Sequence, residues 1–581
     1  MKKLLFFLLL FIPINAFALE ASVVDINELS IQELQYYVDK GYLTYEKITK
    51  LYLDRINEYD EYNAIITINE NAIEQAKKLD EERINSGKRS LIHGLPVIVK
   101  DNIDVKGLPT TNGTKALLDS YPNENAEVVQ KLIDAGAIII AKANMDEFAF
   151  NALYSKSSFG YTYNAYNLDY SSYGSSGGSA VAVASNLAVF ALGTDTGSSI
   201  RVPSSANGVI GIRPSYNIIS SDGVIKFEET RDVVGVITKY VSDNAIVLDI
   251  IDNVDIDYTQ NINKSLDGIR IGVVKSFMNP NTNSTSVTVG KTDKFVYNLM
   301  NKAIEELESL GAEIVYLDNF YLSYSFDASS LCYNFNNYIK NTSSKIKSLS
   351  DLIKNGGYTQ YIDSYNYNCD LDYKKTSSYK NYMNIRNNNI KLANQKFDNN
   401  KLDAMIYPTI KTELAKISEL KTHKLYTPSS STAPLIGFPA LSIPIGYYNN
   451  LPYGMEILAK ENNESIIYQI ASSYESVNNY YKTPDIAPSL YSISENTSIL
   501  LKKYDEYKNN KDFEEANNLV LELFDNYDKN KVNELILKYE SIEHNINEKD
   551  ESLNINYYII ILSTISFIIL LLIIKKVKKW N

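Results

Sequence analysis

Three short segments of the chain contain residues that could do chemistry, namely a lysine at the end of an apolar run and two clusters of glycine and serine. The first is the apolar run Pro96–Val99, which ends at Lys100. This run predicts a buried strand, and burial disfavours a charged ammonium, so Lys100 would be able to act as a base. The simpler alternative is a surface lysine that terminates a strand.

The other two segments are rich in glycine and serine. Residues 173–180 contain Ser175, and residues 193–203 contain Ser199. This composition is common in flexible linkers, but both segments lie between apolar runs that predict helices and strands. If a strand ends near Leu192 and a helix begins near Ser199, the backbone amides between them would form an oxyanion hole. Neither segment has the Gly-Lys-Ser/Thr ending of a phosphate-binding loop.

The composition of the 581 residues disfavours two classes of function, nucleic-acid binding and metal-dependent chemistry. There are 57 Lys and Arg against 70 Asp and Glu, a net charge of -13, which disfavours a broad nucleic-acid-binding surface. The histidines His93, His423 and His544 and the cysteines Cys332 and Cys369 are too few for most metal sites. We therefore expect no nucleic-acid partner and no metal or other cofactor. Whether the two cysteines form a disulfide stays open.

Helix-like and strand-like apolar patterns alternate over residues 25–487, as in an α/β domain. Two units, each a helix followed by a glycine and a strand, illustrate this pattern. They are a helix over 125–134 with a strand over 137–140, and a helix over 294–310 with a strand over 314–317.

Two segments depart from this α/β pattern. Residues 321–382 are rich in Tyr, Asn and Ser, which predicts either an insertion that acts as a lid or only a bias in composition. Residues 489–553 are polar and charged, with Leu, Ile and Val at helical spacing. We interpret this second segment as a polar helical stalk without chemistry of its own.

The two ends of the chain predict export and membrane attachment. Residues 1–18 have two lysines, an apolar stretch and a final Ala-Phe-Ala, which is typical of a signal peptide; the alternative is an uncleaved anchor. Residues 557–574 carry no charge and precede the basic tail 575–581. This pattern favours a transmembrane helix with a cytoplasmic tail over a buried core helix. We expect an exported protein, anchored to the cell membrane, with an extracytoplasmic catalytic domain.

These motifs together resemble those of the amidase signature family. The resemblance rests on Lys100, on Gly-Ser-Ser-Gly-Gly-Ser at 174–179 and on Gly-Thr-Asp-Thr-Gly-Ser-Ser-Ile-Arg at 193–201. Lys100 lies 75 residues before Ser175, which lies 24 before Ser199. The block 144–149 is also similar to one in the A-type subunit of glutamyl-tRNA amidotransferase. The resemblance covers residues 25–487 and implies a central twisted mixed β-sheet with helices on both faces.

The resemblance also implies a role for each motif residue. Ser199 would be the nucleophile, Ser175 a bridging serine that follows a cis peptide bond, and Lys100 the base. The remaining assignments are an oxyanion and substrate loop made of Thr196, Gly197 and Ser198, and supporting contacts from Ser176, Asp195 and Arg201. Asp195 and Arg201 are expected to make structural contacts around the loop rather than to touch substrate.

The sequence departs from the family pattern at four places, one of which is the run before Tyr173, which lacks the expected prolines and arginine. Ser198 stands where a second glycine is usual and would crowd the loop if its φ is positive. Tyr173 replaces a glycine before the bridging serine, and Val236 replaces a proline after Gly235. All three triad positions are intact. These changes bear on rate and substrate fit more than on the class of reaction.

The leading hypothesis is an exported, membrane-anchored amidase that hydrolyses a C–N bond in a small or peptide-like amide through a Ser-Ser-Lys triad. The alternative is a surface binding or scaffold protein on an inactive amidase frame. The third candidate is an amidotransferase A-type subunit, which export would disfavour. The sequence leaves the particular amide and the oligomeric state undetermined.

Overall fold

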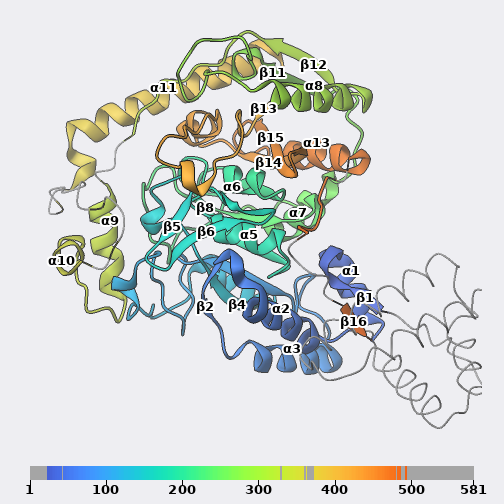
Figure 1. Ribbon diagram of the computed structural model, residues 1–581, viewed down its shortest axis with the longest axis vertical. Helices are drawn as coiled ribbons and strands as arrows, with labels where there is room; N and C mark the ends of the chain where they lie inside the picture. The colour runs from blue at the N-terminus through green and yellow to red at the C-terminus, as the bar shows by residue number, and fades with distance from the viewer. Residues whose placement is uncertain are drawn as a thin grey trace, which may run out of the picture. The chain divides into compact units, whose positions relative to one another are not determined.

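The computed structural model describes residues 23–41, 43–326, 330–356, 358, 362, 369, 372–478, 480–485 and 491–493 (Figure 1). The predicted signal peptide, the transmembrane segment 557–574 and the tail 575–581 lie outside the described residues, as does all but 491–493 of the predicted stalk. Within the described ranges no helix is long and apolar enough to cross a bilayer.

Residues 27–489 separate as one unit from a second unit made of the two terminal segments. In that second unit, β1 (Val23–Asp25) pairs antiparallel with β16 (Tyr491–Ile493). Residues 491–493 therefore form a strand at the start of the segment for which the sequence predicts a helical stalk.

The unit 27–489 is built on a mixed sheet of 11 strands (Figure 1). In spatial order they are β12 (Glu313–Leu317), β11 (Arg270–Val274), β13 (Ala404–Pro408), β15 (Leu451–Ala459), β14 (Ala440–Tyr448), β9 (Ile210–Arg213), β10 (Val233–Thr238), β8 (Phe190–Asp195), β3 (Pro96–Lys100), β4 (Ile138–Ala143) and β2 (Ile65–Ile68). A smaller antiparallel sheet contains β5 (Ser155–Ser157), β6 (Gly160–Asn164) and β7 (Asn167–Ser171).

The α-helices connect and cover these strands. They are α1 (Ile31–Asp39), α2 (Tyr45–Tyr59), α3 (Ala72–Ser86), α4 (Glu127–Asp134), α5 (Gly177–Ala184), α6 (Arg201–Ala206), α7 (Val241–Ile251), α8 (Lys294–Ser309), α9 (Ser330–Tyr338), α10 (Leu349–Asn355), α11 (Ser377–Asn400), α12 (Ala433–Ile436) and α13 (Glu464–Val477).

The central strands are buried on both faces. Every residue of β3, β8 and β10 is buried, and successive side chains of a strand point to opposite faces. Helix α5 packs against these three strands, and α7 packs against β9 and β10. This arrangement confirms the predicted mixed sheet covered by helices.

Both predicted helix-to-strand units form. Helix α4 leads into β4, and α8 leads into β12, with ends within about three residues of the expected ones. Gly136 and Gly311 follow these helices with φ of 92° and 100°. A side chain is strained in this left-handed region, so a glycine can end each helix where another residue would resist the turn.

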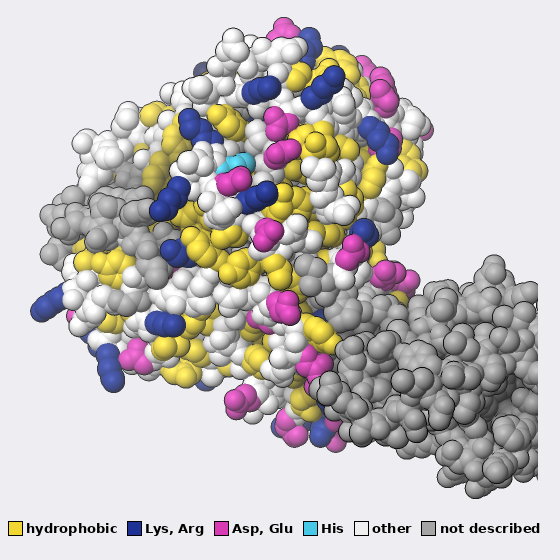
Figure 2. Space-filling view, in the orientation of Figure 1, with side chains coloured by type: hydrophobic (Ala, Val, Ile, Leu, Met, Phe, Trp, Pro, Cys, Tyr) yellow, Lys and Arg dark blue, Asp and Glu magenta, His cyan; other side chains and the backbone are white. Residues whose placement is uncertain are grey.

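The Tyr-rich insertion folds against the rest of the unit. Phe335 and Ile339 lie in one apolar cluster with Leu117, Phe148 and Ile225 of the main body. Cys332 belongs to the same cluster and forms a disulfide with Cys369. The described part of segment 321–382 is therefore packed against the main body. On the face shown in Figure 2, basic and acidic side chains are interspersed.

Tyr173, one of the departures from the family pattern, is accommodated by long-range packing. Its φ is 59°, in the left-handed region, and the side chain is fully buried against Val202 and Leu414. Its hydroxyl accepts a hydrogen bond of 3.0 Å from the backbone N–H of Ala415. The tyrosine thus connects the segment before Ser175 to a distant loop.

We expect Tyr173→Phe to lower the free energy of unfolding by about 1–3 kcal/mol, because the buried N–H of Ala415 loses its acceptor. Urea unfolding measures this change. Tyr36→Phe, at a side chain that is 55% exposed, is the matched control and should shift stability by less than about 0.5 kcal/mol. Equal urea midpoints for Tyr173→Phe and the unchanged protein would contradict the role of this hydrogen bond.

Candidate active site

The sheet brings the three sequence motifs to one edge. Strands β3 and β8 are neighbours and run parallel, so their carboxyl ends meet at the same edge. Lys100 is the last residue of β3, and the 196–199 loop follows β8 directly. Ser175 lies two residues before α5, which packs on both strands.

Lys100 is fully buried, and its amine lies between two hydroxyls. Its Nζ is 2.7 Å from Ser175 Oγ and 2.8 Å from Thr194 Oγ1. Burial lowers the pKa of Lys100 to about 7, although the carboxylates of Asp195, Asp232 and Asp146 act to raise it. The surface lysine considered above is therefore excluded, and the amine can be neutral near neutral pH.

Thr194 is a site residue that the sequence reasoning missed. Its Oγ1 accepts hydrogen bonds from Lys100 and, at 3.2 Å, from Asn102 Nδ2. It stands inside the Gly-Thr-Asp-Thr motif, but that motif does not reveal which side chain faces the lysine. The contact depends on the alignment of β3 with β8.

The two serine segments lie side by side. The Gly174–Ser175 peptide bond is cis, as the family resemblance implied. The Ser176 N–H donates to the Ser199 carbonyl at 3.1 Å. The Ser176 hydroxyl donates to the carbonyl of Thr194 at 3.1 Å, which links this segment to the end of β8. Ser176 thus makes supporting contacts.

The loop 196–199 keeps its backbone N–H groups available as hydrogen-bond donors. Among the described residues, none accepts a hydrogen bond from the backbone N–H groups of 196–199. β8 continues to Asp195, three residues beyond Leu192, because its pairing with β10 extends to Val233. Helix α6 begins at Arg201, two residues later than expected, and is only six residues long. The loop itself, rather than a long helix, must supply the donors.

The side chains of Thr196, Ser198 and Ser199 differ in their surroundings. The Thr196 hydroxyl donates to Asp232 Oδ1 at 2.5 Å, a contact that the sequence did not predict. Ser198 is buried, but its φ is not positive, so the predicted crowding of the loop does not arise. Ser199 is 6% exposed, and its hydroxyl has no hydrogen-bond partner within the described part of the chain.

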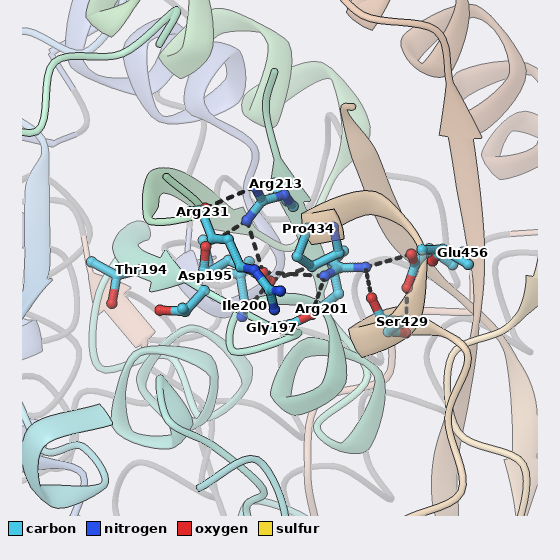
Figure 3. A network of polar contacts seen from close by, with 12 residues as sticks. Thr194, Asp195, Gly197, Ile200, Arg201, Arg213, Arg231, Ser429, Pro434 and Glu456 are labelled. Atoms are coloured by element: carbon cyan, nitrogen blue, oxygen red, sulfur yellow. Dashed lines mark hydrogen bonds and ion pairs between the residues drawn. The ribbon is translucent and has the colours of Figure 1, made fainter. Parts of the chain in front are cut away.

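A buried network of ion pairs contacts the loop (Figure 3). Arg201 Nε and Nη2 donate to the two oxygens of Asp195 at 3.2 and 3.1 Å. Burial acts to raise the pKa of Asp195, but Arg201 and Arg213 outweigh it and hold the pKa below its usual value. Arg201 Nη2 also donates to the Gly197 carbonyl at 2.8 Å, and Nη1 pairs with Glu456.

Asp195 and Arg201 therefore make structural contacts, as the sequence interpretation favoured. The carboxylate of Asp195 also accepts the Ile200 N–H at 3.0 Å, which fixes the turn after Ser199. Arg213 and Glu456 complete the network and were missed because they lie far away in the chain. Within the described ranges no group of three or more His, Cys, Asp or Glu side chains is arranged to hold a metal ion.

Comparisons with known proteins agree with this geometry. The model of the amidase family matches residues 47–467. The A-type subunit of the glutamyl-tRNA(Gln) amidotransferase of Thermoanaerobacter pseudethanolicus is 33% identical over 507 residues, which cover 79% of this chain and 99% of the relative. The protein of the same name from Methanosarcina barkeri is 34% identical over 482 residues, 76% of this chain and 96% of the relative.

Solved structures show the same fold. The peptide amidase of Stenotrophomonas maltophilia superposes with a TM-score of 0.69 at 27% identity, covering 79% of this chain and 99% of that one. The A-type subunit of the glutamyl-tRNA(Gln) amidotransferase of Thermotoga maritima gives a TM-score of 0.61 at 26% identity, covering 80% and 100%. The chain therefore belongs to the amidase signature family and is an amide-hydrolysing enzyme.

Proposed function

We propose that the protein hydrolyses the C–N bond of a small or peptide-like amide through an acyl-enzyme on Ser199. The observation that carries this proposal is the buried Lys100 amine, 2.7 Å from the Ser175 hydroxyl and with a pKa of about 7. A neutral amine in that place is a base for the adjacent hydroxyl.

The proposed reaction moves one proton along the three side chains. Lys100 Nζ takes the proton of Ser175, and Ser175 takes that of Ser199 as Ser199 Oγ bonds to the amide carbon. The free N–H groups of the 196–199 loop stabilise the negative oxygen. The relay returns the proton to the nitrogen as the C–N bond breaks and the amine or ammonia leaves. Water then attacks the ester by the same route and releases the carboxylic acid.

We expect Ser199→Ala and Lys100→Ala each to lower amide hydrolysis by at least about a thousandfold, because each removes a member of the proton relay. An activity-directed serine probe should label the unchanged protein and not Ser199→Ala. The matched control is Ser120→Ala, at a buried hydroxyl without a hydrogen-bond partner in the described structure. Labelling that persists in Ser199→Ala would exclude Ser199 as the nucleophile.

The pH dependence of amide hydrolysis follows from the protonation state of Lys100. Protonated lysine cannot accept a proton, so kcat/KM for a neutral amide should rise with pH and level off above about 7. Rates measured from about pH 5 to 9 test this. A profile that is flat through pH 7, or that falls as pH rises, would remove Lys100 from the role of base. Absence of both hydrolysis and labelling would instead support the binding or scaffold alternative.

We also propose that the enzyme is exported and anchored, with residues 1–18 as signal peptide, 489–553 as stalk, 557–574 as membrane helix and 575–581 as cytoplasmic tail. The residue patterns at the two ends support this. The Cys332–Cys369 disulfide adds support, because disulfides persist in oxidising compartments and are rare in the cytosol.

An amidotransferase A-type subunit is the second candidate. The sequence similarity to proteins named as the A-type subunit of glutamyl-tRNA(Gln) amidotransferase favours it. Such a protein would work with partner subunits in the cytoplasm, where charged tRNA is found, whereas an exported amidase would not meet that substrate.

Cell fractionation distinguishes the exported amidase from the amidotransferase A-type subunit. We expect the full-length protein in the membrane fraction, with residues 1–18 removed and the body open to external protease. Deletion of 557–581 should release it from the membrane, since that deletion removes the only segment proposed to span it. A soluble cytoplasmic protein that retains residues 1–18 would overturn export and favour the amidotransferase candidate.

A further inference from the structure

Three half-buried phenylalanines from distant parts of the chain lie in contact with one another. We call Phe150, Phe227 and Phe326 the aromatic wall. The ring centroids of Phe150 and Phe227 are 4.9 Å apart with the rings edge to face, and those of Phe227 and Phe326 are 5.6 Å apart with the rings stacked. All three residues are partly exposed.

One end of the aromatic wall is fixed to the oxyanion loop. The backbone N–H of Phe227 donates to Asp232 Oδ2 at 2.6 Å, and the other oxygen of Asp232 accepts the Thr196 hydroxyl at 2.5 Å. A single carboxylate therefore joins Phe227 to the loop that contains Ser199. Burial raises the pKa of Asp232, while these hydrogen bonds act to lower it.

The other end is fixed to the segment that holds Ser175. The Asp146 N–H donates to the Ser175 carbonyl at 3.0 Å. The carboxylate of Asp146 accepts the N–H of Asn151 at 2.8 Å, which closes the turn that contains Phe150. The aromatic wall thus adjoins both serine segments and is not a remote patch of the surface.

Segment 321–382 supplies the third ring, Phe326, and the ring of Tyr382, and Arg231 lies against both. Arg231 lies over the rings of Phe326 and Tyr382, 5.5 Å from each centroid. Its Nε donates to Tyr382 Oη at 3.1 Å and lies 3.6 Å from Glu228 Oε2. Arg231 Nη2 has no partner in the described structure. Because Glu228 already balances its charge, Arg231 is poorly placed to attract a second carboxylate.

We infer that the aromatic wall is the subsite for an aromatic or bulky apolar group on the amide substrate, an inference that rests on the proposed hydrolysis at Ser199. Partly exposed aromatic residues gain free energy when an apolar group covers them, and aromatic pairs add an orientation preference. Ligand pockets combine such apolar surface with a few polar groups that fix orientation, here the free amides of 196–199.

The inference is tested by comparing kcat/KM for matched amides with and without a phenyl group. The pairs are phenylacetamide against acetamide, and N-benzylacetamide against N-methylacetamide. The unchanged enzyme should prefer the phenyl compound by about tenfold or more in at least one pair. Phe227→Ala and Phe150→Ala should lower kcat/KM more for the phenyl compound than for its small partner and so remove that preference, and Phe227→Leu should keep part of it.

Phe159→Ala is the matched control, at a half-buried ring that lies against Lys115. It should leave the preference unchanged. Equal preference for both members of each pair by the unchanged enzyme, or an equal loss on both members in the Phe227 and Phe150 variants, would overturn the subsite. A preference for glutamine that Arg231→Gln abolishes would also overturn it, in favour of a carboxylate subsite.

Binding measured on Ser199→Ala separates this inference from the proposed function. Calorimetry should show that Ser199→Ala binds the preferred phenyl amide at least about tenfold more tightly than its small partner, and that adding Phe227→Ala removes the difference. If the unchanged protein neither hydrolyses amides nor is labelled by a serine probe, while this binding difference persists, the proposed function fails and the subsite stands. If hydrolysis and labelling persist without any phenyl preference, the subsite alone fails.

Discussion

The site depends on one buried amine. Lys100 loses its hydration at the end of β3, and no carboxylate bonds to its Nζ within the described structure, so its ammonium form is destabilised. The hydroxyls of Ser175 and Thr194 satisfy the amine without supplying a charge. A carboxylate in direct contact would have kept the lysine protonated and unable to accept a proton. The strands around Lys100 therefore have to exclude water while leaving two hydroxyls within reach.

The second constraint is the loop that follows β8, whose amides must stay free of internal partners. Asp195 and Arg201 meet this constraint by taking over the contacts that would otherwise hold the loop through those amides. Arg201 donates to the carbonyl of Gly197, and Asp195 accepts the N–H of Ile200, on either side of Ser199. Buried ion pairs add little net stability, but removing one partner leaves an uncompensated charge. The network is better understood as fixing geometry than as strengthening the fold.

The insertion is connected to the same loop. Segment 227–232 contacts the insertion through aromatic stacking and through Arg231, and it contacts the loop through Asp232 and Thr196. The Cys332–Cys369 disulfide closes the insertion on itself next to Phe148. Segment 321–382 and the loop 196–199 are thus joined through residues 227–232 by short contacts. A change in the insertion has a direct route to the reacting atoms.

The sequence alone determined the reaction class, the nine motif residues and the α/β pattern. The α/β pattern follows from where apolar runs change period, whereas the reaction class and the proposed roles of the nine motif residues follow from the resemblance of the motifs to a known family. The two helix-to-strand units, whose helices are followed by Gly136 and Gly311, were predicted from the same change of period. Tertiary structure alone decided which side chains meet. Thr194 faces Lys100 because β3 and β8 are in a particular register, and Arg213, Asp232 and Glu456 reach the loop from later strands or the turns before them. Contacts between residues so far apart in the chain leave no local pattern, and only packing brings them together.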